Sequence, residues 1–332
     1  MTPVELSRTV LDAVRRAVDQ GELSVTVPER VVVTEPGGGG CGDFATNVAL
    51  QLARGAGKPA LQVAEILRGR LLRAEGIRDV VVTGPGFLNI SLGDQAGLAV
   101  AVVREIRARG GAYGHSDALA GKVVVLRIPY EVRAEVVADA VVRIIATQGG
   151  RGEVEHGEPV NLRPVPAPED PAPLGADAAQ WALLHPAPHD RPRITADHLV
   201  QREGNPLFRV RYAHARVRAV CRNAGRLGFG AETGPVEARD ALDTRDAHDI
   251  VTALADHPRI LTAAATHRAP DRLARHLVTV ADAVLPFLPT VLPRGEEKPS
   301  AAHRARLALA EAAGTVLAGG LSLLGIDAPE HL

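Results

Sequence analysis

The feature that most restricts the fold is a helical pattern that continues through the C-terminal part of the chain. From Asp197 onward, apolar residues recur at three- and four-residue spacing almost without interruption, as they do in amphipathic helices. The helical stretches lie near residues 197–227, 239–254, 257–267, 270–288 and 300–324. The polar, proline-containing connection at 289–300 predicts a loop. We therefore expect an all-α helical bundle over residues 197–332.

The N-terminal part mixes helical and strand patterns. Residues 80–83 and Phe87–Leu92 have strand patterns and are joined by a Gly-Pro-Gly turn, which predicts a hairpin. Helical spacing occurs at residues 3–20, 45–53, 59–74 and 95–109. Together these patterns predict an α+β domain over residues 1–121.

A shorter segment lies between these two parts. Residues 122–128 predict a buried strand and residues 132–147 a helix, which is half of a βα unit. Within 163–175, the sequence RPVPAPEDPAP has a proline at nearly every second position, which favours an extended linker. A short helical piece follows at 176–184. These patterns predict an incomplete α/β segment over residues 122–196, and the resemblance described below implies that it is a degenerate α/β remnant.

Composition excludes several classes of function. A formal net charge of −1 provides no global attraction for nucleic acid, so any RNA site must be a local patch. The only lysines are Lys58, Lys122 and Lys298. Cys41 and Cys221 lie far apart and outside any Cys/His cluster, so we expect neither a metal site nor a disulfide framework. No apolar run approaches membrane length, and we expect a cytoplasmic protein without membrane contact.

One segment stands out from this neutral background. Residues 202–226 contain seven arginines and one acid, Glu203. On a helix, one apolar stripe would comprise Leu207, Val210, His214, Val217, Cys221 and Ala224. Two arginine rows would flank it, with Arg209 and Arg216 on one side and Arg211, Arg218 and Arg222 on the other. Tyr212 would lie between the rows, where its ring can stack an unpaired base while arginines hold phosphates. The alternative is a solvated face whose arginines pair with acids elsewhere.

Three stretches resemble arginyl-tRNA synthetases, in the order of that family. GDFATNVALQLA at 42–53 and GPGFLNISL at 84–92 look like its N-terminal additional domain, which contacts the outer corner of tRNA at the D-loop. NPLFRVRYAHARVRAVCRNA at 205–224 is similar to the opening of its DALR-type anticodon-binding domain. The ending LSLLGIDAPEHL is close to the usual one, but finishes in His331-Leu332 where a methionine is common.

By position, the resemblance places tRNA-corner contacts on Phe87 and Asn89. An aromatic ring two residues from an amide on one strand face can stack on a base and read its edge. The alternative is a core phenylalanine and a strand asparagine. Asp43 and Asn47 are expected to be structural, because such residues readily cap a following helix.

The two signatures with which a class I synthetase activates its amino acid are missing. That family uses a His-x-Gly-His turn and a Lys-Met-Ser-Lys-like loop to stabilise the ATP phosphates. Residues 122–148 look like the first strand and helix of that domain, but Glu131 replaces the second histidine, and its carboxylate would repel ATP. Residues 157–165 resemble the strand into the lysine loop, but carry Asn161, Leu162 and Arg163 without a lysine. No catalytic residue is expected.

The resemblance implies a non-catalytic synthetase-like protein that binds tRNA, of the tRNA-Arg type, through both end domains. The contacts would be Phe87 and Asn89 in the first, and Arg209, Arg211, Tyr212, Arg216, Arg218 and Arg222 in the second. We expect no ligase activity, no cofactor, and no binding of ATP or arginine; an enzyme that uses charged tRNA would be a partner. One alternative is a protein-interaction module or accessory subunit that no longer binds RNA. Another is a subunit that completes a synthetase or a peptide-forming enzyme in trans.

Overall fold

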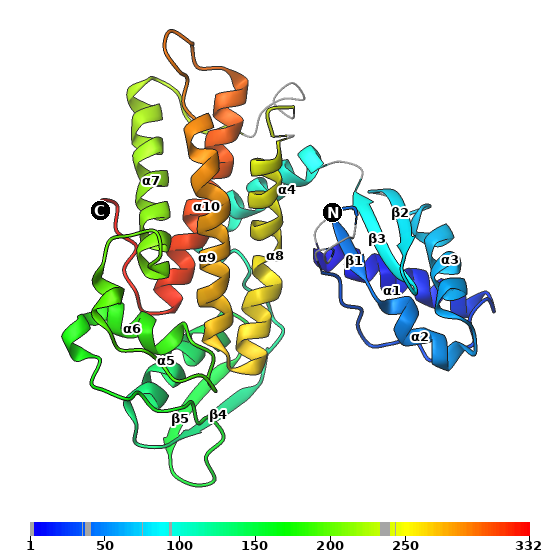
Figure 1. Ribbon diagram of the computed structural model, residues 1–332, viewed down its shortest axis with the longest axis horizontal. Helices are drawn as coiled ribbons and strands as arrows, with labels where there is room; N and C mark the ends of the chain where they lie inside the picture. Colours follow the sequence, from blue (N-terminus) through cyan, green and yellow to red (C-terminus); the bar gives the residue numbers. More distant parts are fainter. Residues whose placement is uncertain are drawn as a thin grey trace. The chain divides into compact units, whose positions relative to one another are not determined.

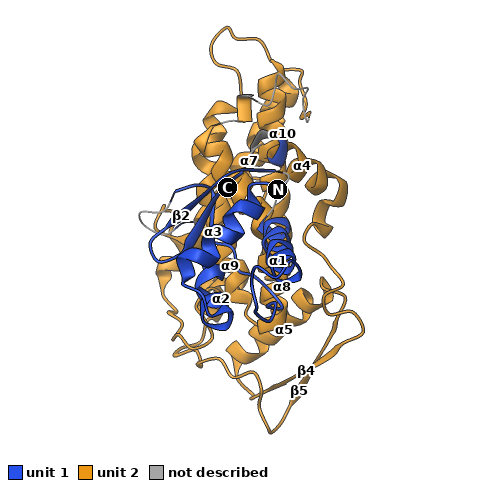
Figure 2. Ribbon diagram, turned by 90° about the vertical axis from the view of Figure 1, so that its right-hand side faces the viewer, with its two compact units in different colours: residues 1–98 blue, residues 99–332 orange. Residues whose placement is uncertain are grey.

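The computed structural model of the protein describes residues 3–34, 36, 41–74, 76–92, 95–232, 240–242 and 244–332. The chain forms two compact units, Met1–Leu98 and Ala99–Leu332, which are coloured separately in Figure 2. The domain boundaries expected after residues 121 and 196 stay predictions. Within the described residues, no helix is long and apolar enough to span a membrane.

The first unit combines a three-stranded antiparallel sheet with helices (Figure 1). In chain order it contains α1 (Pro3–Asp19), β1 (Phe44–Thr46), α2 (Val48–Ala56), α3 (Ala60–Leu71), β2 (Ile77–Thr83) and β3 (Phe87–Leu92). The strand order is β1-β3-β2, and Thr83 pairs with Phe87 across the turn, so the predicted hairpin is confirmed. Leu88 and Ile90 are fully buried on one face of β3, whereas Phe87 on the other face is 40% exposed.

The second unit starts with a parallel βαβ arrangement. α4 (Gln95–Arg109) leads into it, followed by β4 (Val123–Ile128), α5 (Val132–Ala146) and β5 (Arg151–His156). β4 and β5 pair in parallel, with α5 as the crossover that such pairing requires. The sequence pattern did not predict β5, because its residues RGEVEH are mostly polar and exposed.

A buried arginine on α5 anchors the chain that follows β5. Arg133 is 0% exposed, and its N–H groups donate to backbone carbonyl oxygens at distances between 2.7 and 3.0 Å. These carbonyls belong to Val165, Leu183, Pro186, Ala187 and Asp190. The expected linker at 163–175 has no regular structure up to the 3-10 turn Ala172–Leu174, but Arg133 holds it at Val165.

Long helices form the C-terminal bundle, as predicted (Figure 1). They are α7 (Pro206–Arg226), α8 (Arg245–His267), α9 (Pro270–Phe287) and α10 (Ala301–Leu323). The shorter α6 (Ala176–Leu184) packs against α5 and α9. The predicted break between residues 254 and 257 is wrong, because α8 continues through Pro258. Leu254 and Leu261 on either side of this proline are fully buried, so packing outweighs the backbone hydrogen bond that proline removes.

We predict that Arg133→Lys strongly destabilises the second unit. A lysine ammonium has three donors against the five of a guanidinium, so at least two buried carbonyls lose their partner. At roughly 1–3 kcal/mol for each unsatisfied group, the free energy of unfolding should fall by about 3 kcal/mol or more. Urea unfolding followed by Trp181 fluorescence measures this change.

The matched control is Arg151→Lys, because Arg151 is an exposed arginine in the same unit whose side chain is 77% accessible. Its unfolding midpoint should stay at the wild-type value. Equal midpoints for the two variants would contradict the anchoring role of Arg133.

Candidate nucleic-acid interface

The start of α7 is fixed by one side chain. Asn205 is the N-cap residue, and its Oδ1 accepts hydrogen bonds from the backbone N–H groups of Leu207 and Phe208 at 3.1 and 3.4 Å. Its Nδ2 donates to the carbonyls of His198 and Val200, both at 2.9 Å. The cap therefore ties the first turn of α7 to the preceding chain and sets the direction of the side chains on that turn.

The predicted apolar stripe of α7 faces the bundle. Leu207, Val210, His214, Val217 and Ala224 are each at most 5% exposed. His214 is a satisfied core residue, as expected, because its Nδ1 lies 2.9 Å from the carbonyl oxygen of Pro329; burial lowers its pKa.

Cys221 completes this stripe and is partly buried. Burial raises the pKa of its thiol to about 11. A thiol with this pKa stays protonated at neutral pH and is a poor nucleophile.

Two aromatic rings and a guanidinium form a continuous stack on the opposite face of α7. The rings of Phe208 and Tyr212 lie 5.4 Å apart at an interplanar angle of 21°. The Cζ atom of Arg216 lies 5.9 Å from the centroid of the Tyr212 ring, within cation–π distance. Tyr212 is 37% exposed. We name Phe208, Tyr212 and Arg216 the aromatic ridge; their four-residue spacing places them one above another on the helix surface.

The other four candidate arginines pair with acids of the same unit. Their ion pairs are Arg209–Asp282, Arg211–Asp177 at 3.3 Å, Arg218–Glu330 at 2.8 Å and Arg222–Glu330 at 3.5 Å. Arg202 lies before Asn205, the N-cap residue of α7, and is not a member of this set; it pairs with Asp197. Among the described residues, Arg216 alone of the five candidate arginines has no acid partner. The structure thus combines the two readings of this helix: an exposed tyrosine, and arginines paired with acids from elsewhere.

The C-terminal residues 327–332 run along α7 and supply one of these acids. Besides its carboxylate contacts, Glu330 accepts hydrogen bonds from Arg222 through its backbone carbonyl at 3.3 Å. Further along, the backbone N–H of Asp327 donates to Asp177 at 3.1 Å. Asp177 therefore connects α6, α7 and the C-terminal segment.

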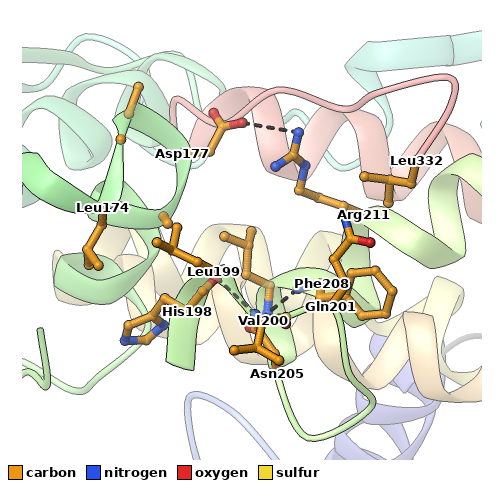
Figure 3. Close-up of a pocket in the computed structure, with 14 residues that line it drawn as sticks. Leu174, Asp177, His198, Leu199, Val200, Gln201, Asn205, Phe208, Arg211 and Leu332 are labelled. Carbon is orange, nitrogen blue, oxygen red and sulfur yellow. Dashed lines mark hydrogen bonds and ion pairs between the residues drawn. The ribbon is translucent and has the colours of Figure 1, made fainter. Parts of the chain in front are cut away.

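A pocket of about 290 Å³ lies beside the aromatic ridge (Figure 3). Phe208 and Leu332 provide apolar wall, and the Arg211–Asp177 ion pair lies at its edge. Gln201 adds a polar amide. A planar, partly polar group next to an exposed ring fits such a pocket.

Sequence reasoning did not identify Phe208, Asp177 or Glu330 as parts of this surface. The four-residue spacing from Tyr212 was a usable signal for Phe208. The two acids lie 35 and 118 positions from Tyr212 in the chain, so no local pattern connects them to it.

The two candidate residues of the first unit differ in exposure. Phe87 is 40% exposed, whereas Asn89 is 2% exposed, although both lie on the same face of β3. The Asn89 side chain donates to the hydroxyl of Thr83 at 2.6 Å and to the carbonyl of Val81 at 3.4 Å. In this structure the amide is used within the sheet, and only the phenylalanine ring is available to a ligand.

The expected structural roles of Asp43 and Asn47 are present in a modified form. Asp43 accepts a hydrogen bond from the backbone N–H of Leu92 at 2.7 Å, which ties it to β3 instead of a helix. Asn47 occupies the N-cap position of α2 without a side-chain capping bond, and instead accepts from Gln51 at 2.9 Å.

Glu131 and Asn161, which stand where the resemblance leads us to expect the activation signatures, have structural roles. Glu131 is the N-cap residue of α5: one carboxylate oxygen accepts from the N–H of Ala134 at 2.9 Å, and the other from Ala167 at 3.3 Å. The positive end of the helix, where a phosphate would bind, is therefore occupied by the chain's own carboxylate. Asn161 accepts from the N–H of Arg127 at 2.9 Å and donates to the carbonyl of Val125 at 3.0 Å, along the free edge of β4.

Sequence comparisons agree on one family. The model of the arginyl tRNA synthetase N terminal domain matches residues 5–92, and that of the DALR anticodon binding domain matches residues 210–332. An arginine–tRNA ligase of Frankia alni is 25% identical over 554 aligned positions that cover 100% of both chains. Because this chain has 332 residues, at least 222 of those 554 positions, the difference, have no residue in it.

Two further ligases align over shorter stretches. That of Renibacterium salmoninarum is 46% identical over 127 residues, 37% of this chain and 23% of the relative. That of Kineococcus radiotolerans is 35% identical over 240 residues, 63% of this chain and 43% of the relative. In these two alignments the chain spans less than half the length of its relatives.

Solved structures share the fold. The arginyl-tRNA synthetase of Thermus thermophilus superposes with a TM-score of 0.73 at 15% identity, covering 100% of both chains. That of Plasmodium falciparum gives 0.70 at 9% identity and 99% coverage of both. With family models matching both ends of the chain, and full-length alignment to a ligase, the chain belongs to the arginyl-tRNA synthetase family.

Proposed function

We propose that this chain is a non-catalytic member of its family that binds tRNA, of the tRNA-Arg type, through its two end domains. The observation that carries the proposal is the aromatic ridge of α7, whose Tyr212 and Arg216 are exposed and lie in a segment that matches an anticodon-binding domain. The function needs neither metal nor cofactor, and no binding of ATP or arginine.

The ridge suits an unpaired base. Stacking on an aromatic side chain contributes about 1–3 kcal/mol per base. Phe208 stacks against one side of the Tyr212 ring and holds it in place. A base that stacks on the side where Arg216 lies displaces this guanidinium, whose Cζ atom is 5.9 Å from the ring centroid. Arg216 has no acid partner among the described residues and is the nearest cation for the adjoining phosphate.

Phosphates can also replace Glu330. Arg218 and Glu330 are 44% and 54% exposed, so their ion pair is a surface contact worth at most about 1 kcal/mol. A phosphodiester that takes the place of the carboxylate would restore the charge contact to Arg218 and Arg222. This exchange gives the arginines a role in RNA binding although they are paired in the free protein.

The proposed loss of catalysis is supported by the N-terminus of α5. Both carboxylate oxygens of Glu131 accept hydrogen bonds from backbone N–H groups, so a nucleotide phosphate at this helix end would meet a fixed negative charge. In this proposal, the bound tRNA is passed on to a partner enzyme that uses charged tRNA.

A second candidate is a protein-interaction module or an accessory subunit that no longer binds RNA, or that completes a synthetase or a peptide-forming enzyme in trans. The four ion pairs that engage the candidate arginines favour it, because they neutralise most of the positive charge of α7. On this view the aromatic ridge would contact a protein.

We predict that the chain binds tRNA-Arg and that Tyr212→Ala weakens this binding about tenfold, because one stacked base is lost. Arg216→Ala should weaken it and reduce its dependence on salt. Glu330→Gln should strengthen it, since Arg218 and Arg222 are released. Electrophoretic mobility shifts with total tRNA and purified tRNA-Arg, at several salt concentrations, measure these effects.

Two matched controls separate the ridge from general surface effects. Tyr130 is an 87% exposed tyrosine on the β4–α5 turn, and Arg226 is an exposed arginine at the end of α7. Tyr130→Ala and Arg226→Ala should bind like the wild type. Binding to tRNA no stronger than to a random RNA, and unchanged by Tyr212→Ala, would overturn the proposal in favour of the second candidate.

For the first unit, we predict opposite effects of substituting its two candidate residues. Phe87→Ala should reduce tRNA affinity with little loss of stability, because the ring is 40% exposed. Asn89→Ala removes a buried hydrogen bond to Thr83 and should lower the free energy of unfolding by about 1–2 kcal/mol. Thermal unfolding and tRNA binding, measured on both variants, test this; a loss of stability confined to Phe87→Ala would contradict it.

We also predict that the chain forms no AMP from ATP in the presence of arginine and tRNA-Arg. An active arginyl-tRNA synthetase serves as the positive control. AMP formation that requires arginine would disprove the non-catalytic assignment while leaving tRNA binding untouched.

A further inference from the structure

A second pocket, of about 490 Å³, lies between the chain that follows α6 and helix α9. Its charged and polar lining comes from His185, Asp190, Arg191, Arg193, His198 and Arg275. It is distinct from the aromatic ridge, and none of the candidate tRNA contacts lines it. Its lining thus contains three guanidinium groups and one carboxylate.

The positive charge of this pocket is only partly compensated. Arg275 pairs with Asp271, whereas Arg191 and Arg193 are exposed and have no acid partner among the described residues. The remaining carboxylate, Asp190, lies 3.8 Å from the exposed His189. With Arg275 neutralised, two guanidinium groups face one carboxylate, which leaves an excess of positive charge.

His185 adds a hydrogen-bonding group without adding charge. It stacks on Trp181 with ring centroids 5.0 Å apart. Burial, together with the nearby Arg275 and His198, lowers its pKa to about 4. At neutral pH its imidazole is therefore uncharged and has one N–H to donate.

The backbone around the pocket is held in place before any ligand binds. Arg133 binds the carbonyls of Pro186, Ala187 and Asp190 from inside the fold. His198 contacts the carbonyl of Arg193 at 2.9 Å. A rim fixed at both ends presents its arginines at a low cost in conformational entropy.

We propose that this pocket binds a phosphate group, presented by an RNA backbone or by a free phosphorylated small molecule. Guanidinium groups match the planar pairs of oxygens on a phosphate and form charge-assisted hydrogen bonds with them. Arg191 and Arg193 supply these contacts, and Arg275 and His185 close the pocket floor.

Trp181 makes the proposal testable in the intact chain. It is the only tryptophan and contacts His185, so its fluorescence reports on the pocket. Titration with inorganic phosphate, against potassium chloride of equal ionic strength, should give a saturable change. The double variant Arg191→Ala/Arg193→Ala should weaken binding at least about tenfold.

Arg107→Ala is the matched control, because it removes an exposed arginine of α4 in the same unit; it should bind phosphate like the wild type. Both substituted pocket arginines are exposed and unpaired, so the double variant should keep its circular dichroism spectrum and melting temperature.

A second titration identifies the source of the phosphate. A short single-stranded RNA without terminal phosphates should bind more tightly than inorganic phosphate if the ligand is an RNA backbone. Adenosine monophosphate should bind more tightly than this RNA if the ligand is a small molecule. No saturable change with any probe, or equal affinities of wild type and double variant, would overturn the proposal. The tRNA proposal would survive that result, because it concerns the separate face of α7.

Discussion

The buried guanidinium of Arg133 is the constraint on which the arrangement of the second unit depends. The chain between β5 and α7 is rich in proline, which has no backbone N–H and cannot extend a strand ladder or a helix interior. Its carbonyl groups nevertheless need donors where they are buried. Arg133 supplies five N–H groups to five such carbonyls. Outside α6 and its short 3-10 turns, a side chain thus satisfies backbone groups that regular secondary structure satisfies elsewhere.

This single anchor links both pockets to α5. The carbonyls of Pro186, Ala187 and Asp190 belong to the rim of the arginine-lined pocket. The carbonyl of Leu183 lies in α6, the helix that carries Asp177 to Arg211 of α7. Burial lowers the pKa of Arg133, and the carbonyl dipoles around it compensate for the lost water. The position of the candidate RNA-binding face therefore depends on a residue remote from it in sequence.

Elements that follow from a locally repeating pattern were predicted from the sequence. Elements that depend on partners distant in the chain were not. The apolar stripe of α7 and the Phe87–Leu92 hairpin follow from spacing alone, and the structure contains both. β5 is polar and exposed, so only its pairing with β4 defines it as a strand. The continuity of α8 through Pro258 depends on burial against neighbouring helices, which outweighs the local preference of proline.

The candidate site shows the same limit. Exposure of Tyr212 follows from its position opposite the stripe, but the partners of the arginines do not. Asp177, Asp282 and Glu330 come from three different segments. A near-neutral net charge indicates that arginines have acids available, without saying which ones.

Glu131 and Asn161 are part of the internal bonding of the fold. A helix N-terminus attracts anions, and in this chain Glu131 fills that position permanently while its second oxygen holds Ala167. Asn161 similarly saturates the edge of β4 that would otherwise be open. A cap and a tether together hold the N-terminus of α5, whereas on α7 the Tyr212 ring is covered only by its helix neighbours Phe208 and Arg216. The two surfaces therefore differ in how many internal contacts a ligand would have to displace.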